Sequence, residues 1–334
     1  MATLKDVAKK AKVSLSTASY ALNGGERVSK ETREKVLKAA VELNYHPNGI
    51  ARSLKKQKTN TIGLFVHDFS GPFYNEIIQG IQDSCKNFGY DLIVCTNNSS
   101  KRFLKEKLVD GAIIIDPYIP DDLLISVADR NFPIITMDRE LNNDYIYNIL
   151  LDNKKGAYDI TTHLIKLGIN TIGYISGPDN SYDNRRRFQG YKDALIDNNK
   201  RFSEKLVLHS DFTEKGGYEI VKEYAQKNSL PEAFFCSNDE MAIGAINALK
   251  ELGIKIPEDI GIVGFDNINI SKYISPQLTT VNIPRFNWGA KCVEILMKLL
   301  NKEQMSERLI MIPVELVVRN SCRNTSGRNG LSYD

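Results

Sequence analysis

The sequence predicts an α/β protein in which a small module of three helices precedes a larger body of parallel strands in two lobes. Three observations support this prediction. The first 60 residues hold 13 Lys and Arg against 5 Asp and Glu, whereas the remaining residues hold 31 against 36. The first 45 residues contain three segments with the apolar spacing of helices. From Thr61 onward, short apolar runs alternate with amphipathic stretches, as expected for parallel strands buried on both faces.

The composition excludes several classes of protein. A chain of 334 residues with 42% hydrophobic and 25% charged residues is long enough for two or three folded domains and too apolar for a disordered chain. No apolar run reaches the roughly 18 residues that span a bilayer, and the N-terminus lacks a signal-peptide core. We expect a cytoplasmic protein without a membrane partner. The five cysteines are widely spaced and include no C-x-x-C pair, which favours buried reduced thiols.

The N-terminal helices follow from their capping residues. Thr3 can cap a first helix with Asp6 at its fourth position, and Ser14 can cap a second helix that ends before Asn23-Gly24-Gly25. A third helix begins after Ser29 and runs to about Asn44. Two short helices joined by a tight turn indicate a helix-turn-helix, whose second helix enters the major groove of DNA.

The uneven charge agrees with that motif. A basic module ahead of a mildly acidic body is the pattern of a protein that binds a polyanion with one end, because each neutralised phosphate releases a counterion. Charge alone leaves open a merely solvated basic surface.

The runs Thr3-Leu4-Lys5-Asp6-Val7-Ala8, Val13-Ser14, Ser16-Thr17, Leu22-Asn23 and Ala51-Arg52-Ser53-Leu54 are similar to those of the LacI/GalR family of bacterial repressors. The resemblance covers the module nearly position for position. Two residues depart from the family pattern: Lys12 stands where Gly is usual, and Ala18 stands where Val is usual. We expect Lys12 to strain the turn and Ala18 to thin the core, without loss of a DNA contact.

The resemblance implies which side chains contact DNA. Leu15, Ser16 and Tyr20 occupy the positions that reach base edges, whereas Thr17 and Ser19 are better placed for phosphates or the helix interface, and Asn23 completes the set. Their chemistry is compatible with this role, because hydroxyls bond to several bases and Leu15 can contact a thymine methyl group. None of them specifies one base pair. The alternative is an ordinary exposed helix face.

The segment from Asn48 to Lys55 is too short to hold a helix alone in water, so we expect disorder in the absence of DNA. By the resemblance it is a hinge helix that pairs with its twin in a dimer. Leu54 would then act as a wedge in the minor groove, with Arg52 and Lys55 near phosphates. The alternative is a linker in which Leu54 packs against the body.

The body resembles the type I periplasmic-binding-protein fold that this family uses as a sensor, with three crossings between lobes. Expected strands cover 62–66, 91–95, 111–115, 133–137, 171–175, 205–209, 233–236 and 260–265. The expected domains are residues 1–47 for DNA binding, 48–60 for hinge and linker, and 61–319 for effector binding and dimerisation. One lobe would span about 61–157 with 286–319 and the other 158–285, and 320–334 would form a mostly disordered tail.

Ligands of open α/β sheets bind beyond the carboxyl ends of the strands, so the residues that follow each apolar run are candidates. Aromatic, carboxylate, guanidinium and amide groups at these positions suit a sugar. The family places effector contacts at positions that match Phe73, Asp138, Arg187, Phe212, Asn238 and Asp266. Alternatives stay open: the two Phe could be core residues, the two Asp could be helix caps, and Asn238 could make an Asx turn. Because Arg185 and Arg186 adjoin Arg187, a phosphorylated sugar remains an alternative effector.

The sequence disfavours an enzyme. It contains no G-x-G-x-x-G, Gly-Lys-Ser/Thr, H-E-x-x-H or G-x-S-x-G motif, and its four histidines lack metal-ligand spacing. We expect no cofactor and no metal. The resemblance implies a homodimeric repressor of carbohydrate-utilisation genes that binds a pseudo-palindromic operator and responds to a sugar or sugar phosphate. Alternatives are a regulator corepressed by a sugar, phosphosugar or purine, and a sugar-binding transport protein of the same fold.

Overall fold

The computed structural model describes residues 2–23, 28–46 and 58–323. Their contacts divide the chain into an N-terminal unit that ends at Thr59 and a body that begins at Asn60. The predicted hinge residues Arg52, Leu54 and Lys55 lie outside the described residues, as do residues 324–334 of the expected tail.

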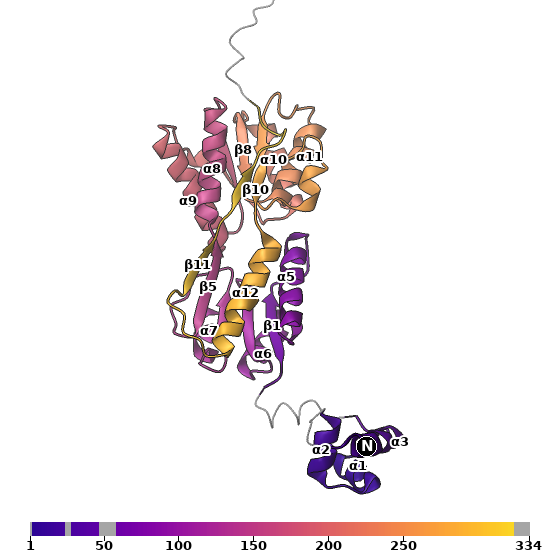
Figure 1. Ribbon diagram of the computed structural model, residues 1–334. Helices are drawn as coiled ribbons and strands as arrows, with labels where there is room; N and C mark the ends of the chain where they lie inside the picture. Colours follow the sequence, from indigo (N-terminus) through magenta and orange to yellow (C-terminus); the bar gives the residue numbers. More distant parts are fainter. Residues whose placement is uncertain (1, 24–27, 47–57, 324–334) are drawn as a thin grey trace, which may run out of the picture. The chain divides into compact units, whose positions relative to one another are not determined.

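The N-terminal unit contains the three expected helices, α1 (Leu4–Ala11), α2 (Leu15–Leu22) and α3 (Lys30–Glu42) (Figure 1). Their predicted caps are confirmed. Thr3 and Asp6 form a capping box at the start of α1. Ser14 accepts a hydrogen bond from the amide of Thr17 at 3.0 Å, and Ser29 accepts one from the amide of Thr32 at 3.3 Å.

Small side chains close the core of this unit. Its buried members are Val7, Ala8, Ala18, Ala21, Val36, Ala39 and Ala40. Ala18 is completely buried, so the smaller residue lies in the core itself. Lys12 ends α1 in the left-handed conformation with φ 53° and ψ 45°, which glycine adopts at little cost and a lysine does not. The expected strain at Lys12 is therefore present in the backbone.

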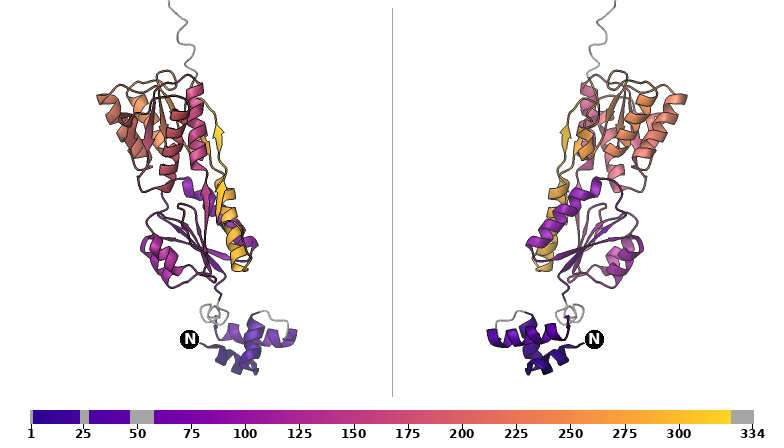
Figure 2. Two further views of the ribbon diagram at one scale, coloured as in Figure 1. Left: turned by 90° about the vertical axis from the view of Figure 1, so that its left-hand side faces the viewer. Right: turned by 90° about the vertical axis from the view of Figure 1, so that its right-hand side faces the viewer.

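The first lobe of the body is built on a six-stranded parallel sheet in the order β11-β5-β4-β3-β1-β2. Helices cover both faces of this sheet, with α5 and α12 side by side on one face (Figures 1 and 2). Its strands are β1 (Thr61–Val66), β2 (Asp91–Thr96), β3 (Gly111–Ile115), β4 (Ile134–Thr136), β5 (Ile146–Leu151) and β11 (Leu309–Ile312). Its helices are α5 (Phe73–Asn87), α6 (Asn97–Lys105), α7 (Asp121–Val127) and α12 (Arg285–Leu300).

The second lobe is built on a four-stranded parallel sheet in the order β7-β6-β8-β9. Its strands are β6 (Ile172–Ser176), β7 (Val207–His209), β8 (Ala233–Cys236) and β9 (Gly261–Val263). Its helices are α8 (Asn153–Lys166), α9 (Tyr182–Asp197), α10 (Glu214–Lys227) and α11 (Asp239–Glu251), with short 3-10 turns at Glu204–Leu206 and Asn269–Lys272.

The chain passes between the lobes at three places. β5 ends at Leu151 and α8, which packs on α9, begins at Asn153. The return paths follow β10 (Thr280–Asn282), which leads into α12, and the step from β11 to β12 (Glu315–Val317). β10 and β12 pair antiparallel, and the amide of Asp152 donates to the carbonyl of Ile312 at 2.9 Å. The crossing segments therefore lie beside one another.

The fold class predicted from the sequence is confirmed, but four strands were missed. These are β5, β10, β11 and β12. In β5 the apolar run is interrupted by Asn148, which is buried and forms hydrogen bonds with Thr136 at the end of β4 and with Leu141 in the loop after it. The other three strands have four residues or fewer, too few to show a clear period.

All five cysteines are buried and free, as expected. Within the part of the chain that the structure describes, no helix combines the length and the hydropathy required to cross a bilayer.

Candidate functional site

One face of α2 is exposed and carries the predicted DNA-contacting side chains. Leu15 and Tyr20 are 45% and 48% exposed, although both are large and apolar in part. Ser16 and Asn23 are exposed as well, while Thr17 and Ser19 are half-buried. The helix contains no carboxylate that would repel a phosphate. The opposite face is buried through Ala18 and Ala21, so the residues assigned to DNA point away from the core.

Hydrogen bonds within α2 hold several of these hydroxyls. Ser14 Oγ lies 2.9 Å from Ser16 Oγ and 2.8 Å from Thr17 Oγ1 at the start of the helix. Asn23 Nδ2 donates to the carbonyl of Ser19 at 2.7 Å and so closes the end of the helix. Ser16 and Thr17 are therefore oriented before any partner binds, and Asn23 has a structural role beside the predicted one.

A cavity of about 930 Å³ in the body is lined by residues from both lobes. It brings together all six predicted effector residues, which come from six separate segments of the chain: Phe73, Asp138, Arg187, Phe212, Asn238 and Asp266. Its volume is in the range of small-molecule sites. The carboxyl ends of the parallel strands of both sheets open toward this cavity, as the general rule for α/β sheets predicts.

Arg187 lines the cavity and is almost fully buried. Its Nη2 lies 3.1 Å from Asp266 Oδ1, and its Nε donates to Asn153 Oδ1 at 2.7 Å. Nη1 donates to the carbonyl of Ser237 at 2.5 Å, and the guanidinium stacks over the ring of Phe265 at 3.9 Å. Burial raises the pKa of Asp266, while the positive charge of Arg187 opposes the rise. This ion pair therefore carries almost no net charge toward a ligand.

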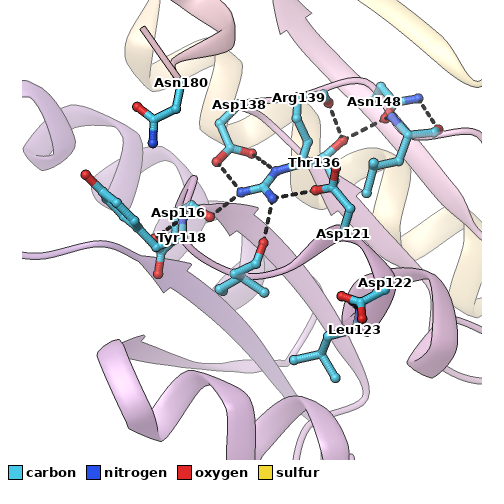
Figure 3. A network of polar contacts seen from close by, with 12 residues as sticks. Asp116, Tyr118, Asp121, Asp122, Leu123, Thr136, Asp138, Arg139, Asn148 and Asn180 are labelled. Atoms are coloured by element: carbon cyan, nitrogen blue, oxygen red, sulfur yellow. Dashed lines mark hydrogen bonds and ion pairs between the residues drawn. The ribbon is translucent and has the colours of Figure 1, made fainter. Parts of the chain in front are cut away.

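Asp138 is fixed by its neighbour Arg139, as Figure 3 shows. Arg139 donates from Nε to Asp138 Oδ1 at 3.1 Å and from Nη2 to Oδ2 at 2.9 Å. The same guanidinium also binds Asp121 Oδ1 at 2.7 Å and the backbone carbonyls of Asp116 and Ile119. Burial raises the pKa of Asp138, and Arg139 lowers it. Asp138 is therefore not a cap of a following helix; its carboxylate is held at the wall of the cavity by Arg139.

Asn238 and Phe212 are joined by a hydrogen bond at the cavity. Asn238 Oδ1 accepts the amide of Met241 at 2.9 Å and caps α11, which is the local hydrogen bond left open as an alternative for this residue. Its Nδ2 donates to the carbonyl of Phe212 at 2.8 Å. Phe212 is in the left-handed region with φ 70°, so this bond stabilises a conformation that a phenylalanine seldom adopts. Phe212 is half-buried at the cavity, and so is Phe73; neither is a fully buried core residue.

Two acidic residues that were not predicted from the sequence also line the cavity. Burial raises the pKa of Asp183 to about 6, although Arg187 lowers it, and Asn153 Nδ2 donates to its Oδ1 at 2.8 Å. Burial raises the pKa of Glu240 to about 7, with further effects from Asp266, Glu214 and Asp68. Both residues lie near the start of a helix rather than directly after a strand, so a search of strand ends does not find them.

The cavity is acidic. Its lining contains the carboxylates of Asp68, Asp138, Asp183, Asp211, Glu214, Glu240 and Asp266, against the positively charged side chains of Arg187 and Lys215. Arg187 is already paired, and Lys215 is 81% exposed on α10. Arg185 and Arg186 do not line this cavity; Arg185 donates to the carbonyls of Asp179 and Asn180. The three adjacent arginines therefore do not form an anion site here.

Among the described residues, no group of three or more His, Cys, Asp or Glu side chains is arranged to hold a metal ion. His67 lies at the cavity, with its ring centroid 4.5 Å from that of Tyr118.

Comparison with known proteins agrees with both units. The model for bacterial regulatory proteins of the lacI family matches residues 3–48, and that for a periplasmic binding protein-like domain matches residues 161–322. The chain is 36% identical to the HTH-type transcriptional repressor PurR of Pasteurella multocida, over 97% of this chain and 99% of that protein.

Two solved structures are similar over nearly the whole chain. A lac repressor dimer bound to operator and the anti-inducer ONPF has 28% identity and a TM-score of 0.84, covering 96% of this chain and 99% of that one. A complex of the transcriptional regulator CelR with cellobiose has 28% identity and a TM-score of 0.71, covering 96% and 100%. The exposed recognition helix, the two-lobed body and these matches agree: the chain belongs to the lacI family of bacterial DNA-binding transcriptional regulators.

Proposed function

We propose that this regulator is a cytoplasmic, homodimeric repressor whose affinity for operator DNA is controlled by an uncharged sugar bound in the interlobe cavity. The observation that carries the proposal is the lining of that cavity. It combines aromatic side chains with carboxylate, guanidinium and amide groups, and it offers no unpaired buried cation. A sugar presents C–H faces to aromatic rings and hydroxyls that need both donors and acceptors.

The charge of the cavity selects among effectors. A phosphate ester would lie near several carboxylates, and the Arg and Lys side chains of the lining are the paired Arg187 and the solvent-exposed Lys215, so its charge would be poorly neutralised in a partly buried site. A neutral polyol instead donates its hydroxyls to Asp138 and Asp266, whose positions are fixed by Arg139 and Arg187. The relative with bound cellobiose shows that a related body accommodates a neutral sugar. The phosphosugar alternative is therefore disfavoured.

The DNA-binding role is assigned to α2, with Leu15, Ser16 and Tyr20 at base edges and Thr17, Ser19 and Asn23 supporting them. Residues 1–47 would form the DNA-binding domain, 48–60 the hinge and linker, and 61–319 the effector-binding and dimerisation domain. Arg52, Leu54 and Lys55 would contact the minor groove and its phosphates. Two copies are required because a pseudo-palindromic operator presents two half-sites to symmetric readers. The body would act by binding rather than by catalysis.

The test is a thermal-shift screen of the full chain with matched ligands. We would compare neutral sugars such as glucose, ribose and cellobiose with glucose 6-phosphate, ribose 5-phosphate and the purines adenine, guanine and hypoxanthine. A ligand present at 100 times its Kd should stabilise the protein by about 2.7 kcal/mol. At least one neutral sugar should raise the melting temperature, and its phosphate ester should not. A larger shift with a phosphosugar or purine than with every neutral sugar would contradict the proposal.

A further inference from the structure

A buried arginine at the start of α12 contacts both lobes. Arg285 is 4% exposed, and its Nη2 lies 3.1 Å from Glu76 Oε1 on α5 of the first lobe. The same side chain donates through Nη1 to the carbonyl of Asp266 and through Nη2 to the carbonyl of Asn267 at 3.2 Å, both in the second lobe. One guanidinium therefore joins a helix of the first lobe to the loop that holds the cavity residue Asp266.

The first-lobe side of this contact is rigid. α5 and α12 lie against each other along their length (Figures 1 and 2). Two glycines permit the close approach, because a Cβ atom at Gly80 would lie 2.1 Å from the carbonyl oxygen of Phe286, and one at Gly289 would lie 2.4 Å from that of Ile77. Glu76 is therefore held at a fixed position relative to the start of α12.

The second-lobe side is strained. Asp266 and Asn267 have φ values of 108° and 51°, two consecutive residues in a region that side chains other than glycine adopt at an energetic cost. Such a loop persists only where its surroundings hold it. The amide of Asp266 donates to Val281 O at 2.9 Å, and the amide of Ile268 donates to Asp239 Oδ2 at 2.9 Å. Arg285 supplies further backbone contacts of the loop, because it donates to the carbonyl oxygens of Asp266 and Asn267.

Stability alone does not account for the buried charge. Within the described part of the chain, Arg285 Nε is buried without a hydrogen-bond acceptor. A buried donor without a partner is costly, and buried ion pairs are often no better for stability than apolar residues of similar volume. The contact is therefore better explained by the position in which it holds the loop.

We propose that Arg285 and Glu76 are positioning residues that hold the Asp266–Asn267 loop against α5, so that a change at the Asp266 carboxylate in the cavity is transmitted to the first lobe. The inference rests on the proposed function only in taking the cavity as the effector site. Arg285 makes no contact with the ligand in this account. It acts through the backbone of Asp266, whose side chain pairs with Arg187.

The test compares Glu76→Gln with Glu294→Gln in the full chain. The two glutamates are matched: their side chains are 42% and 41% exposed, and their ion pairs measure 3.1 Å to Arg285 and 3.0 Å to Lys291. The Glu294 pairs lie within α12 alone, whereas the Glu76 pair joins α5 to Arg285, the residue that also binds the second-lobe loop. Both substitutions keep the size of the side chain and remove its charge. Arg285→Lys serves as a second variant that keeps the charge and loses the planar fork.

The first readout is hydrogen exchange of the ligand-free protein. Glu76→Gln and Arg285→Lys should raise the exchange rates of the amides of Asp266 and Ile268 at least fivefold, and Glu294→Gln should leave them within twofold. Trp288, the single tryptophan of the chain, donates to Ile149 O at 2.7 Å one turn after Arg285 and reports on the start of α12. Its emission should stay unchanged in all variants. A red shift of Trp288 in Glu76→Gln would show that the pair merely holds the helix together, which would overturn the proposal.

The second readout is operator affinity without ligand, measured on an operator selected from a random-sequence pool. Glu76→Gln should change this affinity at least fivefold relative to both the parent and Glu294→Gln. Equal affinities, or loop exchange that is unchanged in both Glu76→Gln and Arg285→Lys, would overturn the proposal. Neither readout uses a sugar, so failure of the ligand screen would contradict the proposed effector and leave this test valid.

Discussion

Nη2 of Arg187 lies 3.1 Å from Oδ1 of Asp266, and both side chains are almost completely buried at the cavity that lies between the lobes. Arg187 is also bound to Asn153 and to the carbonyl of Ser237. The pair therefore orients a carboxylate toward the ligand while its own charge is compensated. Because Arg187 is bound to so many groups, its removal would damage the body as well as the site.

Asp266→Asn is the sharper test of this pair. The substitution keeps the shape of the side chain and removes the negative charge that accepts ligand hydroxyls. We expect ligand affinity to fall by more than about tenfold, since a hydrogen bond to a charged group contributes roughly 1.5–3 kcal/mol. Calorimetry with the sugar that gives the thermal shift measures this, and an unchanged Kd would place the ligand elsewhere.

The exposed face of α2 should determine sequence selectivity. Leu15→Ala and Tyr20→Ala remove base-edge contacts without removing a charge, so the ratio of operator to random-duplex affinity should fall about tenfold, as expected for losses of 1–3 kcal/mol per contact. Val41→Ala is the control, because Val41 is 80% exposed in the same unit but lies on α3. Titrations against both duplexes provide the ratio. Equal selectivity in all three variants would refute the assignment of α2.

Lys12→Gly should stabilise the N-terminal unit. A residue other than glycine in the left-handed conformation costs about 1–2 kcal/mol, which the substitution removes. The greater freedom of glycine in the unfolded chain offsets about 0.5–1 kcal/mol of this stabilisation. The amides of α1 and α2 should therefore exchange severalfold more slowly in the variant. Lys9→Gly is the control, because Lys9 lies inside α1 and its replacement should speed exchange. Faster exchange in Lys12→Gly would show that Lys12 stabilises the turn in another way.

Glu240 should make the stability of the body depend on pH. Its pKa is raised from 4.5 to about 7, so the folded state keeps a proton that the unfolded state has lost. The free energy of unfolding therefore falls as the pH rises from about 4.5 to about 7, and this loss persists above pH 7. Glu240→Gln removes the loss, and its melting temperature should exceed that of the parent by more at pH 8 than at pH 5.5.

Glu219→Gln is the control for that measurement, since Glu219 is 63% exposed on α10 and outside the cavity. Its difference in melting temperature from the parent should be the same at both pH values. A pH-independent difference for Glu240→Gln would mean that its carboxyl group is as well solvated in the fold as in the unfolded chain.

The sequence predicts the N-terminal unit well because short-range chemistry decides it. Thr3, Ser14 and Ser29 each bond to an amide three residues ahead, so the helix starts are readable from single residues. The body is harder to predict. Asn148 looks like a break in an apolar run, and its burial is explained only by its hydrogen bonds to Thr136 and Leu141, which depend on how β4 and the loop after it fold back onto β5.

The residues of the cavity were also only partly predictable from the sequence. Residues that follow strands, such as Asp138 and Asp266, could be found from the order of apolar runs together with the family resemblance. Asp183 and Glu240 could not, because their significance depends on burial beside other carboxylates. The contacts of Arg285 likewise join residues 76, 266 and 285, which no local pattern relates.

The central claim, that a neutral sugar in the interlobe cavity controls operator binding, is tested most directly by one titration. Full-length protein would be titrated into a labelled operator selected from a random pool and into a scrambled duplex of equal length, with and without the sugar that gives the largest thermal shift. The account predicts that a saturating sugar changes the operator Kd at least tenfold, about 1.4 kcal/mol of coupling, while the Kd for the scrambled duplex stays the same. An operator Kd that does not respond to saturating sugar would contradict it.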